Sequence, residues 1–390
     1  MHVLQISFFV DRERRRPEAL LEAWHSLADV AAAAASAGLG VTVVQASLVP
    51  AVIFRGGVEF LFLAPEAPGV PLAGGATFHG LLRSRAADVL HVHGLDFADD
   101  VLALRAAAPD VPILLQDHAD RPPRLWRRPR WRRGAAAADG VSFCARAQAA
   151  PFARAGLLPP HAQIFEIPES TSTFRPGDRA AARAATGVHG DPAVLWVGHL
   201  DRNKDPLTVL DGVAAAAREL PGLRLWCCFG SAPLLGDVQA RIAGDARLRG
   251  RVHLLGRVPH AAVETLMRAA DLFVLGSRRE GSSFALIEAL ATGLTPVVTD
   301  IPPLRALTGG GAVGALWPCG DSPALARALV GAAATAAAPA ARAAVRTHFD
   351  AELSSGALGR KLAAAYSALV QAKRMAAAAP GAAAAAGQPP

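Results

Sequence analysis

Short apolar runs alternate with helical patterns along most of the chain, which predicts parallel α/β units. The first run, Val3–Ile6, predicts a buried strand, and Pro17 marks the start of a helix after it. Apolar residues recur at intervals of three and four over 20–31, so one face of this helix is expected to pack on the sheet. Gly38 ends the helix, and Val41–Val44 predicts the next strand.

The same alternation predicts two series of strands. The first series continues at Val58–Leu63, Val89–Val92, Ile113–Leu115 and Val141–Phe143. The second series is predicted at Val194–Val197, Leu223–Cys228, Val252–Leu255, Leu272–Leu275 and Pro296–Val298. Between the two series lies Pro168–Gly177, which is rich in turn formers and marks a domain boundary.

The fold class expected from this pattern is α/β, with two Rossmann-like domains facing across a cleft. The first domain is expected over residues 1–168, a linker over 169–177 and the second domain over 178–349. Residues 350–375 are expected to form helices that pack back on the N-terminal domain, and the Ala/Pro-rich stretch 376–390 to be disordered. Open α/β sheets bind ligands at the carboxyl ends of their strands, so a ligand site is expected there.

The composition excludes a disordered polycation. Of the 390 residues, 52% are hydrophobic and 19% are charged, and 40 Lys and Arg against 33 Asp and Glu give a net charge of +7. The mean hydropathy of +0.27 reflects the abundance of Ala. The longest uncharged stretch, 30–54, contains Gly38, Gly40 and Pro50, which argue against a membrane helix. Because the chain shows no basic N-terminal region and no Cys spacing typical of metal sites or disulfides, we expect a cytoplasmic location, with peripheral contact at the inner membrane face left open.

One unit of strand, loop and helix carries the strongest chemical signal. The strand Leu272–Leu275 leads into a loop over 276–283 and then into a helix. Ser283 is expected to cap this helix, whose N-terminus after a glycine-containing loop suits the binding of a diphosphate. Glu280 and Glu288 are eight residues apart, so both are expected to reach one ligand at the mouth of the cleft.

The pair Glu280 and Glu288, followed by Ala289–Asp300, resembles the donor-binding signature of family-4 retaining glycosyltransferases with the GT-B fold. Other segments are similar to that family in order and spacing. They are His91–Gly94, Gln116–His118, Trp196–Lys204, Phe229–Pro233 and Gly256–Val258. The resemblance covers most of the chain and implies that the N-terminal domain binds an acceptor and the C-terminal domain a nucleotide sugar.

The resemblance also implies a role for each matching residue. Glu280 would contact the donor-sugar hydroxyls, and Glu288 would contact the ribose hydroxyls. Lys204 would neutralise the leaving diphosphate, and His118 would lie near the reacting sugar. His118, Glu280 and Lys204 are therefore the candidate catalytic residues. Further candidates on the donor side are Gly198, His199, Arg202, Val258, Gly281, Ser282 and Ser283.

These roles imply transfer of a sugar, of hexosyl type, from a nucleotide diphosphate sugar to an unidentified acceptor with retention of configuration. A nucleotide-sugar epimerase on the same fold is an alternative, as is a non-catalytic protein that binds sugar nucleotides. His199 in place of the usual Arg, and Asp11–Arg16 in place of a Gly-Gly loop, keep the non-catalytic alternative open. No Asp-x-Asp pair ends a predicted strand, so neither a metal nor another cofactor is implied beside the nucleotide sugar.

The segment Arg121–Arg133 carries seven Arg and no acidic residue, with two Trp interleaved. Such a segment can bind nucleic acid, lie on an anionic membrane or remain a solvated loop beside the cleft. No nucleic-acid-binding motif accompanies it, so nucleic acid is not expected as a partner. Because the segment follows His118, we place Arg124, together with His93, on the acceptor side. There we expect an anionic acceptor, or the membrane that holds a lipid-linked one.

Overall fold

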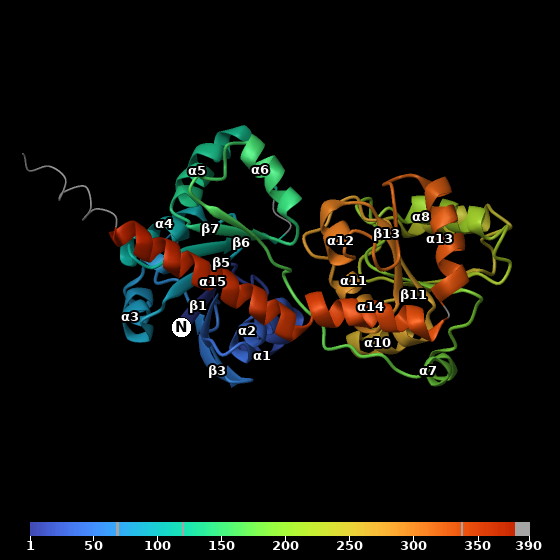
Figure 1. Cartoon of the computed structure of the whole chain (residues 1–390), viewed down its shortest axis with the longest axis horizontal. Coiled ribbons are helices and arrows are strands. Elements are labelled where there is room, and N and C mark those ends of the chain that lie inside the picture. The colour runs from blue at the N-terminus through green and yellow to red at the C-terminus, as the bar shows by residue number, and fades with distance from the viewer. Residues whose placement is uncertain (68–69, 119–120, 337, 379–390) are drawn as a thin grey trace, which may run out of the picture. The chain divides into compact units, whose positions relative to one another are not determined.

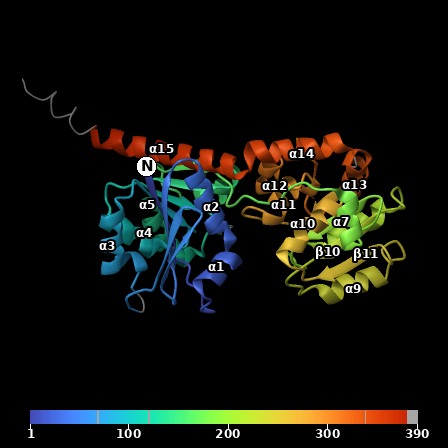
Figure 2. The ribbon, with the colours of Figure 1, turned by 90° about the horizontal axis from the view of Figure 1, so that it is seen from below.

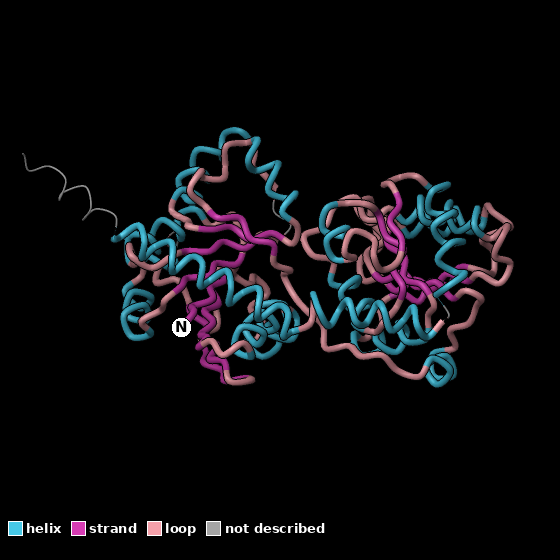
Figure 3. The backbone as a smooth tube through the Cα atoms, in the orientation of Figure 1, coloured by secondary structure: helices cyan, strands magenta, loops and turns pink. Residues whose placement is uncertain are grey.

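The computed structural model describes residues 1–67, 70–118, 121–336 and 338–378. Within them the chain forms two compact units. The first unit contains Met1–Ser170 and the chain from Ser355 onward, and the second contains Thr171–Ser354. Figure 3 shows that strands gather at the centre of each unit and that helices surround them. Each unit therefore has its own sheet and its own core.

The described part of the first unit is built on an eight-stranded sheet with the order β3-β4-β2-β1-β5-β6-β7-β8 (Figure 1). In chain order its strands are β1 (His2–Ser7), β2 (Gly40–Ala46), β3 (Ala51–Arg55), β4 (Val58–Leu63), β5 (Val89–His93), β6 (Ile113–Gln116), β7 (Gly140–Phe143) and β8 (Gln163–Glu166). Neighbouring strands are parallel, apart from the antiparallel pair of β3 and β4 at one edge. The strand order reverses between β1 and β5, where Ser7 lies opposite His93. Open α/β sheets bind ligands at such a reversal.

Helices cover both faces of this sheet because the strand residues alternate between two apolar cores. Val3 belongs to one core, and its neighbour Leu4 belongs to the other. The first core is closed by α1 (Pro17–Ala23), α2 (His25–Ser36) and α15 (Ser355–Ala378). The second core is closed by α3 (Ala76–Arg85), α4 (Ala98–Ala107), α5 (Arg128–Ala136) and α6 (Ala150–Arg154). The described 3-10 turns are η1 (Leu72–Gly74), η2 (Leu125–Arg127) and η3 (Arg146–Ala149).

Helix α15 is the last described element, and it packs beside α2 although the two are far apart in sequence (Figure 2). The two backbones approach closely at Gly359, where a Cβ atom would overlap the carbonyl oxygen of Ala33. Farther along α15, Tyr366 is fully buried, and its hydroxyl lies 2.8 Å from Nδ1 of His91. Helix α15 thus closes the core and supports a histidine of β5.

The described part of the second unit is built on a six-stranded parallel sheet with the order β11-β10-β9-β12-β13-β14. Its strands are β9 (Ala193–Val197), β10 (Arg224–Cys228), β11 (Val252–Gly256), β12 (Leu272–Leu275), β13 (Thr295–Thr299) and β14 (Ala315–Trp317). Its helices are α7 (Arg179–Thr186), α8 (Pro206–Ala216), α9 (Leu235–Ala243), α10 (His260–Ala269), α11 (Phe284–Ala291), α12 (Pro302–Leu307), α13 (Ser322–Ala336) and α14 (Pro339–Glu352). Here the strand order reverses between β9 and β12.

Both faces of the second sheet are buried as well. Val194, Trp196 and Val274 pack in the core under α8 and α13. Leu195 and Phe273 alternate with them, are fully buried and point to the opposite face, which α10, α11 and α14 cover. Continuous apolar strands of this kind are typical of a parallel sheet covered on both sides.

The structure confirms the α/β fold class and every predicted strand, and it corrects the prediction elsewhere. The structure also contains β3, β8 and β14, which were not predicted. Strands β3 and β8 are partly exposed along their length and β14 has only three residues, so the apolar pattern of each is weak. The single helix predicted from Pro17 is wrong, since the chain leaves the helical conformation at Trp24 (φ −118°, ψ 58°) and forms α1 and α2. The break places the Trp24 indole edge-on against Phe9, with ring centroids 5.1 Å apart. Periodicity along the chain does not encode this contact.

The segment predicted as a linker packs largely within the second unit, which begins at Thr171. Phe174 is buried, and its ring lies 4.9 Å from the imidazole of His260. Helix α14 also extends the second unit beyond the predicted end, and α15 begins at Ser355 in the first unit. Of the predicted disordered tail, 376–378 belong to α15 and the rest lies outside the described residues.

Among the residues that the structure describes, no single helix combines the length and the apolar composition of a membrane span. The segments Ser322–Ala336 and Pro339–Ala378 have the required length and apolar composition only when they are taken together as a bent pair.

Candidate active site

Two loops follow neighbouring strands at the point where the strand order of the second sheet reverses. The loop over 198–205 follows β9, and the loop over 276–283 follows β12. The amide of Arg278 donates to the carbonyl of Asn203 at 2.8 Å, and the Asn203 side chain donates to the carbonyl of Arg279 at 3.0 Å. The two loops therefore form one surface at the carboxyl ends of the strands, where α/β sheets bind ligands.

A cation of one loop and a carboxylate of the other form an ion pair. Nζ of Lys204 lies 2.5 Å from Oε1 of Glu280, and the two side chains are only 17% and 11% exposed. The carboxylate of Asp201 accepts a hydrogen bond from the Lys204 amide at 2.8 Å, which fixes the backbone beside the pair. A largely buried charge is costly without a partner, so each group holds the other in place. The structure thus brings together Lys204 and Glu280, two of the predicted catalytic residues.

Glu288 lies within α11 and has a different partner. Its Oε1 is 2.6 Å from Nε2 of His260, the first residue of α10. The Glu288 side chain is 10% exposed and that of His260 is 61% exposed, so the pair reaches solvent on the histidine side. Sequence analysis missed His260 because no spacing along the chain relates it to Glu288.

The three residues before α11 were predicted to bind the sugar or the phosphates. Gly281, Ser282 and Ser283 are all buried. Ser283 occupies the N-cap position, but its side chain makes no capping hydrogen bond with the part of the chain that the structure describes, so the predicted cap is wrong. The helix dipole still places partial positive charge at this end of α11.

The loops after β9 and β11 contribute the remaining predicted donor-side residues, Gly198, His199, Arg202 and Val258. Nδ1 of His199 accepts a hydrogen bond from the Ser231 amide at 3.2 Å, so a neutral His199 carries its proton on Nε2. A Cβ atom on Gly230 would lie 3.6 Å from the His199 ring and 3.9 Å from the guanidinium of Arg257. Arg257 was not among the predicted site residues. It supplies a permanent charge beside the histidine that replaces the usual Arg.

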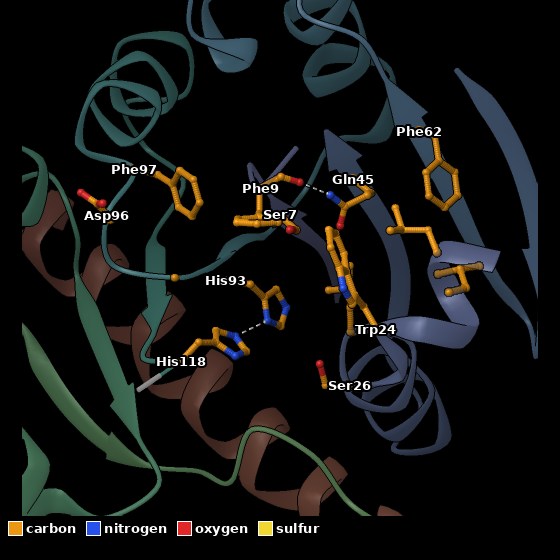
Figure 4. A pocket seen from close by; sticks show the side chains of 14 residues that line it. Ser7, Phe9, Trp24, Ser26, Gln45, Phe62, His93, Asp96, Phe97 and His118 are labelled. Atoms are coloured by element: carbon orange, nitrogen blue, oxygen red, sulfur yellow. Dashed lines mark hydrogen bonds between the residues drawn. The ribbon is translucent and has the colours of Figure 1, made fainter. Parts of the chain in front are cut away.

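The first unit contains a pocket at its own strand reversal, between β1 and β5 (Figure 4). Its volume of about 500 Å³ is typical of small-molecule sites. Strands β1, β2 and β5 supply the polar residues Ser7, Gln45 and His93. Apolar side chains make up much of the remaining lining, among them Leu20, Leu21, Trp24, Leu27, Phe62 and Phe97.

Two histidines and a glutamate form a hydrogen-bonded chain at this pocket. Nδ1 of His93 lies 3.1 Å from Nε2 of His118, and Nδ1 of His118 lies 2.9 Å from Oε2 of Glu169. An ionised Glu169 is an acceptor, so we assign a proton to Nδ1 of His118, and a neutral His118 then accepts from Nδ1 of His93. This assignment leaves Nε2 of His93 as an acceptor, and that buried atom has no partner within the described residues. Figure 4 shows the two imidazoles directed toward each other in the pocket.

Burial keeps the histidines of β5 neutral. Removal from water, together with the neighbouring His118, lowers the pKa of His91 to about 3. Removal from water, and then the neighbouring His91 and His118, lower the pKa of His93 well below its usual value. His93 is therefore an uncharged hydrogen-bonding group near neutral pH.

Arg124, predicted on the acceptor side, is not among the described residues that line this pocket. Its guanidinium lies 5.3 Å from the ring of Trp126, which is 71% exposed. Trp131, the other tryptophan of the basic segment, is buried, and its indole N–H donates to Asp96 at 2.8 Å. The segment thus has one surface tryptophan and one core tryptophan.

Comparison with known proteins identifies the domain that carries the paired loops. Residues 191–334 match the family model of glycosyl transferases group 1. Most of the second unit is therefore similar to group 1 glycosyl transferases, and we call the matched residues 191–334 the group 1 domain. The D-inositol 3-phosphate glycosyltransferase of Mycobacterium tuberculosis is 37% identical to the chain over 147 residues, which are 37% of this chain and 30% of that protein. The match therefore spans less than a third of that relative's length.

Solved structures extend the similarity to almost the whole chain. Sucrose-phosphate synthase from Thermosynechococcus elongatus has a TM-score of 0.67 and 20% identity, and the match covers 95% of this chain and 99% of that chain. Anabaena HepE in complex with UDP has a TM-score of 0.69 and 17% identity, and the match covers 94% of this chain and 100% of that chain. At such identities the likeness shows the fold, which is GT-B, as the resemblance predicted.

The charged groups of the group 1 domain suit the stabilisation of an anion. The paired loops, the loop after β11 and helix α11 present the ammonium of Lys204, the guanidinium of Arg257 and the carboxylates of Glu280 and Glu288 within one unit. In the described ranges of the chain, no group of three or more His, Cys, Asp or Glu side chains is arranged to hold a metal ion. The charged groups named above can supply hydrogen bonds and charge stabilisation to an anion.

Proposed function

We propose that this protein is a glycosyltransferase that moves a sugar, of hexosyl type, from a nucleotide diphosphate sugar to an acceptor with retention of configuration. The observation that carries the proposal is the Lys204–Glu280 ion pair at the strand reversal of the group 1 domain, with Glu288 in the helix that follows. The family match and the fold support it. Anabaena HepE has been solved with UDP and with UDP-glucose, so a UDP-sugar is the first donor to test.

In this proposal the donor binds at the carboxyl ends of β9 and β12. The Lys204 ammonium has three N–H donors, so it can keep its bond to Glu280 and bind a phosphate oxygen as well. As the glycosidic bond breaks, Lys204, Arg257 and the N-terminus of α11 stabilise the charge that develops on the leaving diphosphate. Glu280 accepts hydrogen bonds from the sugar, and Glu288 accepts them from the ribose.

The acceptor hydroxyl is proposed to bind in the pocket of the first unit, beside His93 and His118. Retention follows when the new bond forms on the face from which the diphosphate departs. Because attack is on that same face, retention requires no carboxylate nucleophile. The acceptor proton passes to an oxygen of the departing diphosphate, so no separate base is required. His118, held by Glu169, orients the hydroxyl through His93.

A screen of nucleotide diphosphate sugars tests the proposal. A ligand present at about 100 times its Kd stabilises the folded state by about 2.7 kcal/mol, so a bound donor should raise the Tm by several degrees. With an acceptor present, NMR of the product should show the anomeric configuration of the donor. We expect transfer to persist in a metal chelator, because the proposed site uses protein groups alone.

The same screen separates the alternatives. Conversion of the donor into an isomer without any acceptor would identify an epimerase. A raised Tm without product or free nucleotide would identify a non-catalytic binding protein.

We also propose that the protein contacts an anionic membrane through a basic–aromatic patch, made of Arg121, Arg124, Leu125, Trp126 and Arg127. All five residues are exposed, and the two apolar side chains are about 70% exposed (72% and 71%). Tryptophan favours the headgroup level of a bilayer, and arginines near an anionic surface gain about 1 kcal/mol each. Other arginines of the segment are engaged within the fold, since Arg130 pairs with Asp99 and Arg132 donates to backbone carbonyls.

Removal of two patch arginines should weaken membrane binding. Arg124→Ser/Arg127→Ser is expected to reduce binding to phosphatidylglycerol vesicles by about tenfold or more, since two surface arginines contribute about 2 kcal/mol. Co-sedimentation measures the bound fraction. Arg218→Ser/Arg249→Ser removes the same charge from exposed positions of the second unit and is the matched control. Equal binding by both double variants would rule out the patch as the contact.

A further inference from the structure

We infer that the pocket of the first unit takes an uncharged acceptor, a hydroxyl compound that carries an apolar group. The inference rests on the proposed function, because it names the class of acceptor that the transferase would use. It differs from the anionic acceptor that the basic segment predicted.

The charge of the pocket disfavours an anion. Among the described residues that line it there is no Lys or Arg, and its carboxylate, Asp96, is negative. Arg15 lies 5.7 Å from the centre of the Trp24 ring, but its guanidinium is already 2.6 Å from Glu13. His93 is neutral, as its lowered pKa shows. A phosphate bound here would lose its hydration without gaining a cation in return.

The shape of the pocket favours an apolar group. Helices α1 and α2 present Leu20, Leu21 and Leu27 to the pocket, and the break between these helices adds Trp24. Phe9 packs edge-on against Trp24 and is 56% exposed, so an aromatic face continues from the pocket to the surface. A ligand that covers these side chains removes apolar surface from water, which is favourable.

The polar side of the pocket suits one hydroxyl. Nε2 of His93 is buried, and it has no partner among the residues that the structure describes. In the tautomer assigned above for the chain from Glu169 through His118, this nitrogen is an acceptor, so it can receive the O–H of a ligand. A buried acceptor without a partner is costly, and a bound hydroxyl removes that cost.

Titration calorimetry with three probes tests the inference: hexyl β-D-glucoside, glucose and glucose 6-phosphate. We expect the hexyl glucoside to bind at least tenfold more tightly than glucose, and glucose 6-phosphate to bind no more tightly than glucose. Tighter binding of glucose 6-phosphate than of the hexyl glucoside would overturn the inference, and so would the absence of binding by all three probes.

A matched pair of variants locates the binding. Phe9→Arg adds a cation at the exposed edge of the pocket and should reduce the preference for the hexyl glucoside over glucose 6-phosphate by at least tenfold. Phe54→Arg makes the same change at a position of the first unit that is 76% exposed and does not line the pocket, so the preference should not change. Equal effects of both variants would place the binding elsewhere and overturn the inference.

A parallel titration with UDP and UDP-glucose keeps the two proposals separate. If these bind and are turned over while the probes bind in the opposite order, only the acceptor class is wrong. If the probes bind in the expected order but no nucleotide sugar in the screen binds, the glycosyltransferase proposal fails.

Discussion

Lys204→Met is expected to lower the turnover of the donor by about 10²–10³-fold, the effect of removing one group that stabilises charge in a transition state. The substitution also leaves the Glu280 carboxylate, which is 11% exposed, without its cation. Removing one member of a largely buried ion pair costs up to about 3–5 kcal/mol of stability, so the Tm should fall as well. Steady-state kinetics and thermal denaturation measure the two effects separately.

The double variant Lys204→Met/Glu280→Gln is the control for stability. It removes the carboxylate charge together with the ammonium charge, so the Tm should recover toward that of the unmodified protein. Turnover should stay low, because no ammonium is present to meet the leaving diphosphate. Near-normal turnover in either variant would show that the leaving group is stabilised by other residues.

Glu288→Ala is expected to weaken binding of the nucleoside diphosphate by about 10–100-fold, since a hydrogen bond to a charged group contributes about 1.5–3 kcal/mol. The proposed partners of this carboxylate are ribose hydroxyls. The unmodified protein should therefore prefer UDP to 2′-deoxy-UDP, and Glu288→Ala should lose most of that preference. Calorimetric Kd values for the two nucleotides give the ratio.

The histidine beside this carboxylate provides a comparison. His260→Ala removes the 2.6 Å contact with Glu288 but keeps the carboxylate, so we expect a smaller loss of affinity and a retained preference for the ribose hydroxyl. His260 is in this view a positioning residue. An unchanged preference for UDP in Glu288→Ala would show that the ribose does not bind at α11.

The apolar strands were predictable because a strand in a covered parallel sheet must be apolar on both faces. The runs at β9 and β12 show this pattern within four or five consecutive residues. Strands β3 and β14 were not predictable, since an exposed edge strand and a three-residue strand carry little of the pattern. The helix break at Trp24 was not predictable either, because its indole contacts Phe9, which lies outside the helical window.

The candidate site was predictable only in part. Lys204, Glu280 and Glu288 were predicted from motifs that resemble those of a known family, and the structure places these residues in loops and a helix that follow central strands. Their hydrogen-bonding partners were not assigned, since Lys204 and Glu280 are 76 residues apart and Glu288 and His260 are 28 apart. Arg257 was missed because its position beside His199 depends on how two loops pack around Gly230.

Local order in the chain was enough to specify the continuous apolar strands, the division into two sheets and the loops that carry charged residues, because these depend on near neighbours and on where each strand ends. The pairing of those residues came from packing over long separations. The clearest case is the hydroxyl of Tyr366, which reaches His91 across 275 residues. The apolar pocket beside His93 likewise depends on the helices that close around it. The neutral state of His93 and the apolar lining depend on side chains that bury one another, and these come together only in the assembled fold.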